Sequence, residues 1–449
     1  MTVVGAPLLW SPRFRATTAG LFLLSVLFAF ESFAIATVMP VVGREFDALS
    51  SYPLAFAAPI AVSVFAICLA GVWIDRAGPG AALYVGVAVF AAGLICAALA
   101  PGMPVFLAGR AVQGFGSGLA GVALYVLVAV AYPEELRARV FTVLTSGWVL
   151  PALIGPPVAG GLADAAGWRW VFAVAPLPAT VAAVALIPAV RQARPPDTPG
   201  RTAPSLWWAG VAAVAVLVVG VAGRQEIAGW PLAAAVAVAA VFRSVPRLVP
   251  AGTWRFAAGL PAVLSARSLT GAAFFGAEVY VPLALVQFHG FTPAHAGMFL
   301  TVSALAWFAG SWIAAHVPVL SDAVLRVRWG TAAVAVGIGA SATVLRPEVW
   351  PAVPLIGWSV ASLGIGIVFS SASVLLLDYS PPEQTGANSA AMQVNDAVAQ
   401  SVWLCAGGTL FAASAAAAWG FAAMFAGAAV VAAGAYAAAA RITASSSMR

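Results

Sequence analysis

The chain has 449 residues, of which 63% are hydrophobic and only 8% are charged, and its mean hydropathy is +1.00. A soluble domain carries about 25% charged residues, so this composition excludes a water-soluble protein and indicates a polytopic membrane protein. The net charge of +6 comes from 21 basic residues, all Arg, which form no patch interleaved with aromatic residues, so no nucleic-acid partner is expected.

Apolar runs of membrane length follow one another along the chain, and about 20 apolar residues suffice for one span. The first six runs cover residues 17–42, 51–74, 80–100, 103–131, 139–163 and 169–190. A Pro-rich connector and two shorter runs follow, 205–223 and 229–246; the second ends in Arg residues and is either a span or an interfacial helix. Six more runs cover 258–287, 293–317, 327–345, 350–379, 386–414 and 417–440. The sequence therefore predicts about fourteen spans, or twelve if the shorter pair does not cross.

The arginine distribution predicts the orientation. With a cytoplasmic N-terminus, sixteen Arg fall in loops on the inner side, Arg267 among them, and four fall outside. By the positive-inside rule, both termini are expected in the cytoplasm. The exclusive use of Arg among basic residues and the Ala-rich helices suggest a GC-rich bacterial genome, so the expected location is the bacterial cytoplasmic (inner) membrane.

Similar features recur in the same order in the two halves. Gly71–Ile74 is echoed by Gly310–Ile313, and Gly114-Phe115-Gly116 by Gly364-Ile365-Gly366. We predict an internal repeat, a common construction of transporters, although chance similarity among Ala/Gly-rich helices is the alternative. The predicted domains are a six-helix bundle over 1–190, a linker with two extra helices over 191–256, and a second six-helix bundle over 257–449.

The charged turn after the second run resembles the loop signature of the major facilitator superfamily, Gly-x-Leu-(Ala)-Asp-Arg-x-Gly-Arg-Lys. Here it runs from Gly71 to Gly78, with Trp73 in place of the Leu and Pro79-Gly80 in place of the basic pair. The resemblance implies an all-α major facilitator fold of two six-helix bundles with a pseudo-two-fold repeat. It also implies a conformational latch in which Asp75 meets a helix end or an Arg of the other half. The latch residues are Gly71, Asp75, Arg76 and Gly78.

Three further motifs resemble the fourteen-span drug:proton antiporter branch of that superfamily. Glu31 stands nine residues before Pro40, as the Asp of its first-span motif does, and Arg110 to Gly116 resembles the fourth-span motif Arg-x-x-Gln-Gly-x-Gly. The fifth run resembles the antiporter motif Gly-Pro-x-x-Gly-Gly, which implies a seal on the cytoplasmic side; ordinary packing glycines are the alternative. Its residues are Gly155, Pro156, Pro157, Gly160 and Gly161.

Charges inside spans cost some 2.5 to 3.5 kcal/mol each, so the few present are the candidate proton-coupling residues, namely Glu31, Arg110, Glu278 and Asp396. Burial disfavours a charged carboxylate and a nearby Arg favours it. Glu31 is thus expected to bind a proton when separated from Arg110, unless the two form a permanent pair that locks two helices. Glu278 either faces the cavity or is hydrogen-bonded near the lipid. Asp396 either lines the cavity or is hydrated near the cytoplasm.

The expected function is proton-coupled efflux of a hydrophobic or amphipathic small molecule, a cation rather than an anion, by a monomer in the lipid bilayer. Aromatic and amide side chains inside spans either line the substrate cavity or pack. They are Phe30, Phe33, Gln113, Trp148, Phe275, Tyr280, Trp307 and Gln393. Alternatives are a proton symporter that imports a nutrient, a membrane enzyme and a non-transporting sensor. No cofactor is expected, and the isolated His289, His295 and His316 predict no metal site.

Overall fold

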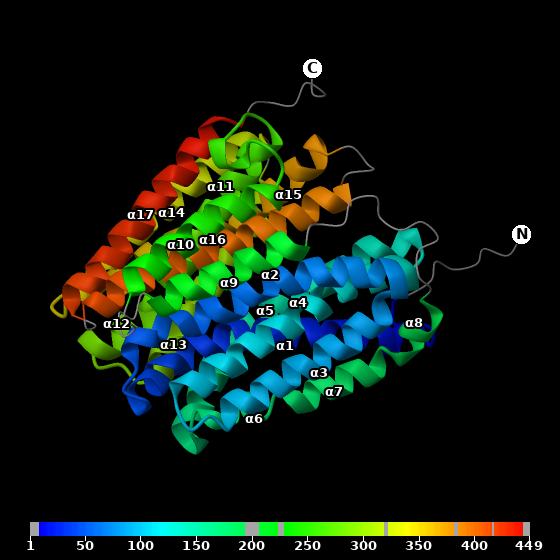
Figure 1. Ribbon diagram of the computed structural model, residues 1–449, viewed down its shortest axis with the longest axis horizontal. Helices are drawn as coiled ribbons and strands as arrows, with labels where there is room; N and C mark the ends of the chain where they lie inside the picture. The colour runs from blue at the N-terminus through cyan, green and yellow to red at the C-terminus, as the bar shows by residue number, and fades with distance from the viewer. Residues whose placement is uncertain are drawn as a thin grey trace, which may run out of the picture.

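The computed structural model describes residues 9–193, 206–222, 229–317, 322–380, 385–414 and 417–442. Every regular element in these ranges is a helix, and the long helices lie side by side (Figure 1). The start of α1 and the end of α17 lie at the same end of the bundle, which we call the termini face; the opposite end is the far face. This architecture confirms the prediction of an all-helical polytopic membrane protein.

The first group of helices contains five long helices and one interrupted one. Pro176 is the first residue of one piece of the interrupted helix and Pro188 the second residue of another, since proline has no N–H to continue the preceding helix. The elements are α1 (Arg15–Glu45), the 3-10 turn η1 (Leu49–Ser51), α2 (Tyr52–Ala77), α3 (Pro79–Ala98), α4 (Met103–Ala131), α5 (Glu134–Ala166), α6 (Arg169–Ala173), α7 (Pro176–Ala185) and α8 (Ile187–Gln192).

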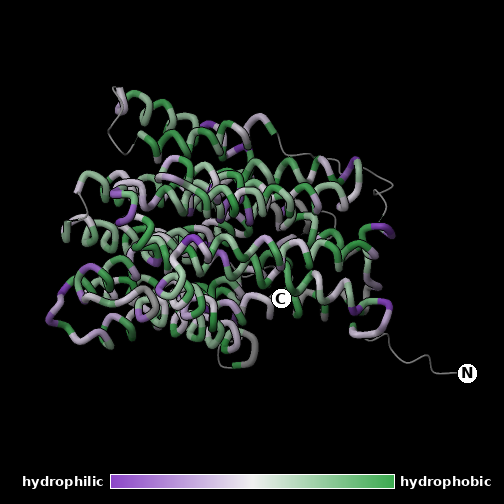
Figure 2. Tube along the Cα trace, turned by 90° about the horizontal axis from the view of Figure 1, so that it is seen from below, coloured by the Kyte–Doolittle hydropathy of each residue, from purple (hydrophilic) through white to green (hydrophobic). Residues whose placement is uncertain are grey.

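A helical hairpin follows, made of α9 (Leu206–Ala222) and α10 (Trp230–Ser244). α9 packs against α2 and against α16 of the second group, whereas α10 packs on α9 and on the short turn η2 (Val245–Arg247). The hairpin therefore lies at the edge of the molecule (Figure 2). A further 3-10 turn, η3 (Thr253–Arg255), leads into the second group.

The second group starts with a helix that breaks near its middle. Pro282 has no N–H for the carbonyl of Glu278, so the run predicted as 258–287 divides after that residue. The elements are α11 (Leu260–Glu278), α12 (Tyr280–Phe288), α13 (Pro293–His316), α14 (Ala323–Ser341) with the 3-10 turn η5 (Ala342–Leu345), α15 (Ala352–Tyr379), α16 (Thr385–Ala413) and α17 (Ala418–Ala440).

Eleven stretches among the described residues are long and apolar enough to cross a membrane, and α9 adds a shorter apolar helix. The hairpin helices have 17 and 15 residues, close to the lower limit of about 17 for a span. All fourteen predicted runs are helical, and several match closely; the run 103–131 coincides with α4.

Two helix pairs, α3–α4 and α14–α15, are built on the same glycine contacts. A Cβ on Gly93 would lie 2.3 Å from the backbone nitrogen of Gln113, and one on Gly337 would lie 2.4 Å from that of Ala361. Only glycine permits such close approach of two backbones. The contacting glycines are seven residues apart on every helix: Gly86 and Gly93 on α3, Gly109 and Gly116 on α4, Gly330 and Gly337 on α14, and Gly357 and Gly364 on α15.

This pattern corrects the register of the predicted repeat. Gly116 corresponds to Gly364, because both lie against the helix before them, so the predicted match of Gly114 with Gly364 is wrong by two residues. The match of Gly71 with Gly310 is also wrong. Gly118 packs on Ser63 of α2 as Gly366 packs on Trp307 of α13, and in that register the counterpart of Asp75 lies outside the described residues. Glycine-rich helices resemble one another at several offsets, which is why composition alone misplaced the register.

Candidate functional site

Glu31, Arg110 and Gln113 meet inside the first group of helices and form what we call the Glu31 cluster. All three are at least 95% buried. The Nε2 of Gln113 donates to Glu31 Oε2 over 2.9 Å, and Arg110 Nη1 lies 3.6 Å from the same oxygen. Arg110 Nη1 also donates to Gln113 Oε1, so the amide bridges the two charges. The cluster therefore joins α1 and α4 through one carboxylate oxygen.

A proline of α2 supplies a further contact to Arg110. Pro59 has no N–H, so the carbonyl of Ala55, four residues earlier, has no partner in its helix. Arg110 Nε donates to this carbonyl over 3.3 Å. A Cβ on Gly114 would lie 2.1 Å from the Pro59 carbonyl oxygen, so glycine there lets α4 approach the proline closely. In the motif from Arg110 to Gly116, the arginine makes the polar contacts, and the glycine at 114 allows the close helix packing that positions it.

The second carboxylate oxygen of Glu31, Oε1, has no hydrogen-bond partner among the described residues. An unsatisfied buried acceptor costs about 1 to 3 kcal/mol, and protonation of the carboxyl would remove the charge that makes it costly. Arg110 stays charged in either state because a guanidinium is not deprotonated in proteins. The cluster can therefore hold or release one proton, depending on how closely the guanidinium and the amide approach the acid.

Glu278 is the last residue of α11 and lies at the break before α12. Its side chain is half-buried, and the part of the chain that the structure describes offers it neither an ion pair nor a hydrogen bond. The next carbonyl, of Val279, accepts a hydrogen bond of 2.9 Å from the Tyr52 hydroxyl of the first group. The acid therefore lies beside a contact between the two groups.

Asp396 forms a second charge pair, which we call the Arg267 cluster. Its carboxylate accepts from Arg267 Nε over 2.9 Å and from the Ser268 hydroxyl over 2.6 Å. Arg267 also donates to Ser373, and its guanidinium lies 4.1 Å from the centroid of the Phe369 ring. The cluster ties together α11, α15 and α16. Asp396 is 8% exposed, so in this conformation it is a buried and paired acid.

The prediction that Arg267 lies in a loop is wrong, because it stands inside α11, two helix turns from its start. Its position within the predicted run 258–287 is the signal that identifies it as an intramembrane charge. Three ion pairs occur among the described residues. Two lie inside the bundle, one in the Glu31 cluster and one in the Arg267 cluster. The third, Glu45–Arg169, joins the far-face ends of α1 and α6 at 2.5 Å.

Most of the predicted cavity residues pack rather than gather around one space. Phe30 and Phe33 of α1 lie over Gly155 of α5, and the rings of Phe275 and Trp307 are 5.7 Å apart. Gln113 belongs to the Glu31 cluster instead of a cavity wall. Tyr280 is fully buried and packs on Phe411, whereas Trp148 and Gln393 are exposed.

The antiporter motif lies in the half of α5 toward the far face, and the seal on the cytoplasmic side stays a prediction. A Cβ on Gly297 of α13 would lie 3.0 Å from the carbonyl oxygen of Pro156 and 3.1 Å from Thr37 of α1. The motif therefore contacts the second group near the far face. Gly155 and Gly160 are buried, Pro157 is half-buried, and Gly161 is exposed.

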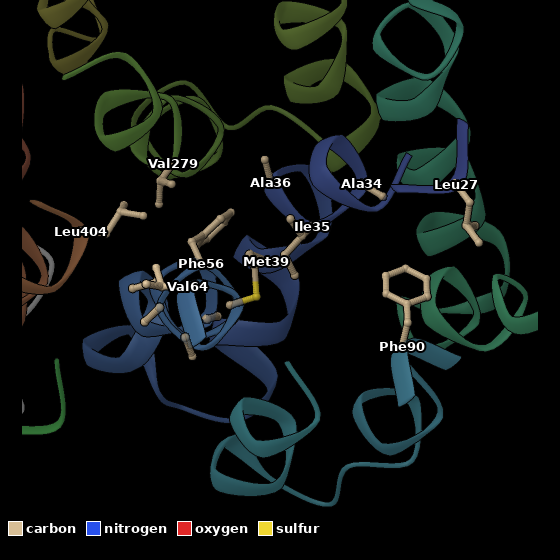
Figure 3. Packing of buried hydrophobic residues seen from close by; sticks show 14 of the residues in the cluster. Leu27, Ala34, Ile35, Ala36, Met39, Phe56, Val64, Phe90, Val279 and Leu404 are labelled. Carbon is tan, nitrogen blue, oxygen red and sulfur yellow. The ribbon is translucent and has the colours of Figure 1, made fainter. Parts of the chain in front are cut away.

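Other contacts close the far face between the two groups. Besides the hydrogen bond from Tyr52 to Val279, a Cβ on Gly408 of α16 would lie 2.9 Å from Pro53 of α2. Figure 3 shows Phe56 of α2 pointing toward Val279 and Leu404 of the second group. The two groups are therefore packed together at this end of the bundle.

The predicted latch at the termini face makes no contact between the two groups within the described ranges. Gly78 has φ 75°, a conformation that favours glycine, and it allows α2 to end and α3 to start with Pro79. Arg76 is exposed and Asp75 half-buried, and in the described ranges neither has an ion pair or a hydrogen bond through its side chain. A Cβ on Gly71 would contact nothing within 4 Å. The predicted contact of Asp75 with the other half is absent from this conformation among the described residues.

No group of three or more His, Cys, Asp or Glu side chains that could hold a metal ion occurs among the described residues. His289 bonds to the Val344 carbonyl and His295 to Thr292, while the side chain of His316 lies outside the description.

Comparison with known proteins gives one family for most of the chain. The profile of the Major Facilitator Superfamily matches residues 21–404. A probable multidrug-efflux transporter of Mycobacterium tuberculosis is 28% identical over 397 residues, which cover 82% of this chain and 81% of that protein. The multidrug efflux pump SdrM of Staphylococcus aureus is 26% identical over 171 residues, 38% of each chain.

Solved structures share the fold at low sequence identity. A crystal structure of a POT family transporter in complex with a thioalcohol-conjugated peptide has a TM-score of 0.72 and 12% identity, covering 93% of this chain and 94% of that one. A bacterial homologue of the human lysosomal transporter Spinster, in an inward-facing and unoccupied conformation, has a TM-score of 0.67 and 14% identity, covering 96% of this chain and 98% of that one. At these identities the likeness describes the fold alone.

Proposed function

Because the chain belongs to the Major Facilitator Superfamily, whose members are secondary transporters and not enzymes, we propose that it exports a hydrophobic or amphipathic small molecule in exchange for protons. The observation that carries this proposal is the Glu31 cluster, in which a buried acid shares one oxygen with Gln113 and Arg110, while its other oxygen has no partner in the part of the chain that the structure describes. Efflux is further supported by the names of the relatives in Mycobacterium tuberculosis and Staphylococcus aureus. We assign the chain to the drug:proton antiporter branch with fourteen helices.

In this mechanism Glu31 is the proton carrier and Arg110 is the group that expels the proton. Close approach of the guanidinium favours the carboxylate, and movement of α4 away from α1 favours the protonated acid. The Gln113 side chain bonds to both Arg110 and Glu31, so a change in the distance between these charges also changes the hydrogen bond that Glu31 accepts. In alternating access, the protein switches between a state open at one face and a state open at the other, and each proton transferred accompanies one such switch.

The orientation we propose places the termini face in the cytoplasm of a bacterium, with the protein in the inner membrane and acting as a monomer. The far-face contacts from Tyr52 to Val279 and from Pro53 to Gly408 then correspond to a state closed toward the outside. Asp75 and Arg76, which have no partner among the described residues, fit the same state. We retain the division into a bundle over 1–190, a linker with extra helices over 191–256 and a bundle over 257–449.

A cationic substrate is the class that we favour. Glu278 is an acid without a partner among the described residues, and it lies at the break between α11 and α12 beside the contact of the two groups. A carboxylate without a counter-charge suits a cation, and the relatives named as multidrug-efflux proteins are consistent with that chemistry. Glu278 is then a second site for a proton or for the cation itself.

The test is efflux from proteoliposomes under an imposed pH gradient, with a panel of cationic, neutral and anionic amphipathic compounds. We expect cations to move against their gradient when protons flow the other way, and Glu31→Gln to reduce this exchange to the level of empty vesicles. Glu45→Gln is the matched control, since it removes an acid from the same helix whose partners are Trp168 and Arg169 at the far face.

Undiminished proton-driven exchange by Glu31→Gln, with the variant folded, would reject the mechanism. Equal loss in Glu31→Gln and Glu45→Gln would show that the effect is general to α1. Movement of a compound together with protons, rather than against them, would replace export by import.

A further inference from the structure

Two arginines share one tryptophan at the termini-face end of the α9–α10 hairpin. The guanidinium carbon of Arg247 lies 4.3 Å from the ring centroid of Trp208, and that of Arg243 lies 5.6 Å from the same ring. Both arginines are exposed, and within the ranges that the structure describes neither has an acidic partner. Arg247 Nη1 also donates to the backbone carbonyl of Arg243, so both guanidinium groups are held at one end of the hairpin, and two positive charges there attract an anion.

The surroundings of this pair are apolar and face outward. Phe242 packs edge-on against Trp254, with ring centroids 5.2 Å apart, and both side chains are exposed. Leu232 and Val236 continue along α10 with 71% and 61% of their surface exposed. α10 packs on α9 and the turn η2, and its other side is exposed. An exposed apolar stripe thus leads along the helix to the two positive charges.

We propose that Arg243, Arg247 and Trp208 form a binding site for the phosphate of an anionic phospholipid, whose acyl chains lie along Leu232 and Val236. Guanidinium groups bind phosphate in a planar, bidentate manner, and tryptophan anchors at the membrane interface. The apolar stripe distinguishes a lipid from a free phosphate ion, which would use the charges alone. The site gives the hairpin, which lies outside the two six-helix bundles, a role in holding lipid at the termini face.

The experiment counts lipids retained by the purified full-length protein. Protein reconstituted in phosphatidylcholine with phosphatidylglycerol is released into the gas phase, and native mass spectrometry measures the two bound lipids. We expect the wild type to prefer phosphatidylglycerol about tenfold, as two arginines at an anionic surface allow, and Arg243→Gln with Arg247→Gln to lose this preference. Arg13→Gln with Arg15→Gln removes the same charge from the exposed start of α1 and is expected to keep it.

Equal loss of preference in both double variants would overturn the site, since any exposed charge would then suffice. Displacement of phosphatidylglycerol from the wild type by excess inorganic phosphate would also overturn it, because the ligand would be a free anion. If the Gln pair does not fold, Arg243→Lys with Arg247→Lys decides. This variant keeps the charge but loses the planar stack on Trp208, so the preference should fall about threefold, and an unchanged preference would reject the site.

Discussion

The two halves of the molecule share a backbone pattern but place different chemistry on it. In the register that pairs Gly116 with Gly364, Arg110 of α4 corresponds to Trp358 of α15. Trp358 is fully buried, and its ring stacks on Phe274 of α11 with centroids 4.7 Å apart. The first half therefore has a carboxylate and a guanidinium where the second half has two stacked aromatic rings.

The second half has its own charge pair, at another depth. Arg267 lies seven residues before Phe274 on α11, which is about 10 Å nearer the termini face. Gly155 of α5 contacts Phe33 of α1, and Trp403 of α16 contacts Gly276 of α11 in the same way. Gly155 therefore corresponds to Trp403. Seven residues earlier on each helix, Trp148 corresponds to Asp396. Each half thus places a charge pair at a level where the other half has an apolar or aromatic residue.

The difference indicates a division of tasks. The equivalent glycine contacts of α3–α4 and α14–α15 make the two helix pairs equally close, which suits rigid halves that rock against each other. The charge pairs are not equivalent, because Glu31 keeps one oxygen without a partner among the described residues, whereas Asp396 accepts from two donors. The backbone contacts that the two halves share serve their movement, and the charges in which they differ serve the coupling to protons.

The largest effect is expected from replacing the charge pair of the first half by an apolar contact like that of the second. Arg110→Met alone leaves Glu31 buried without a counter-charge and should lower the free energy of unfolding by about 3 to 5 kcal/mol. Adding Glu31→Leu should restore most of that loss, because apolar replacement of both partners is near neutral. Unfolding in detergent measures stability, and the double variant should transport no protons.

A double variant no more stable than Arg110→Met would show that the cost of the single change comes from lost packing. Retained proton transport in the double variant would remove the Glu31 cluster from the coupling mechanism. In either case the proposed contrast between the two halves would fail at its central position.

The second charge pair should matter for stability more than for coupling. Arg267→Gln or Asp396→Asn removes a charged hydrogen bond between α11 and α16, worth about 1.5 to 3 kcal/mol. Since both carboxylate oxygens of Asp396 are already bonded, we expect the ratio of protons to substrate to stay unchanged. Thermal unfolding and the stoichiometry of exchange separate the two quantities. Altered stoichiometry at normal stability would transfer the proton site to the second half.

Much of the fold could be predicted from the sequence because hydropathy is a local property. A long apolar run has few stable forms in a bilayer, and the helix is the simplest, so the helical class follows from composition. The break in α11 was missed because Pro282 stands in an apolar run, and proline is tolerated in membrane helices. The break places Glu278 at a helix end because Pro282 leaves the Glu278 carbonyl without a backbone donor.

The site could be predicted only in part, because side-chain partners depend on the rotation of each helix. Resemblance brought Glu31 and Arg110 together, yet the bridging role of Gln113 requires both to face it. The sequence places Arg267 in a loop because its partner, Asp396 of α16, lies over a hundred residues away in the chain. A local stretch of sequence cannot predict an ion pair between residues so far apart.

The glycine contacts allow the shared scaffold to be tested in both halves. Gly93→Ala and Gly337→Ala each force a Cβ against a backbone nitrogen, at 2.3 and 2.4 Å, and should cost about 1 to 3 kcal/mol alike. Only Gly93→Ala displaces Gln113, so it alone should reduce proton-driven exchange in the folded fraction. Gly339→Ala is the control on α14, since its Cβ would contact nothing within 4 Å. Unequal destabilisation by the two core changes would argue against equivalent scaffolds.

The smallest expected effect lies at the contact between the halves. Tyr52→Phe removes the hydrogen bond to the Val279 carbonyl, which is worth about 0.5 to 1.5 kcal/mol, and should shift the balance toward an open far face about two- to tenfold. Distances between spin labels at the far-face ends of α2 and α12 measure this balance. Tyr280→Phe removes a hydroxyl that has no partner among the described residues and should leave the balance unchanged. Equal shifts in both variants would mean that ring packing, rather than this hydrogen bond, holds the two halves together at that end.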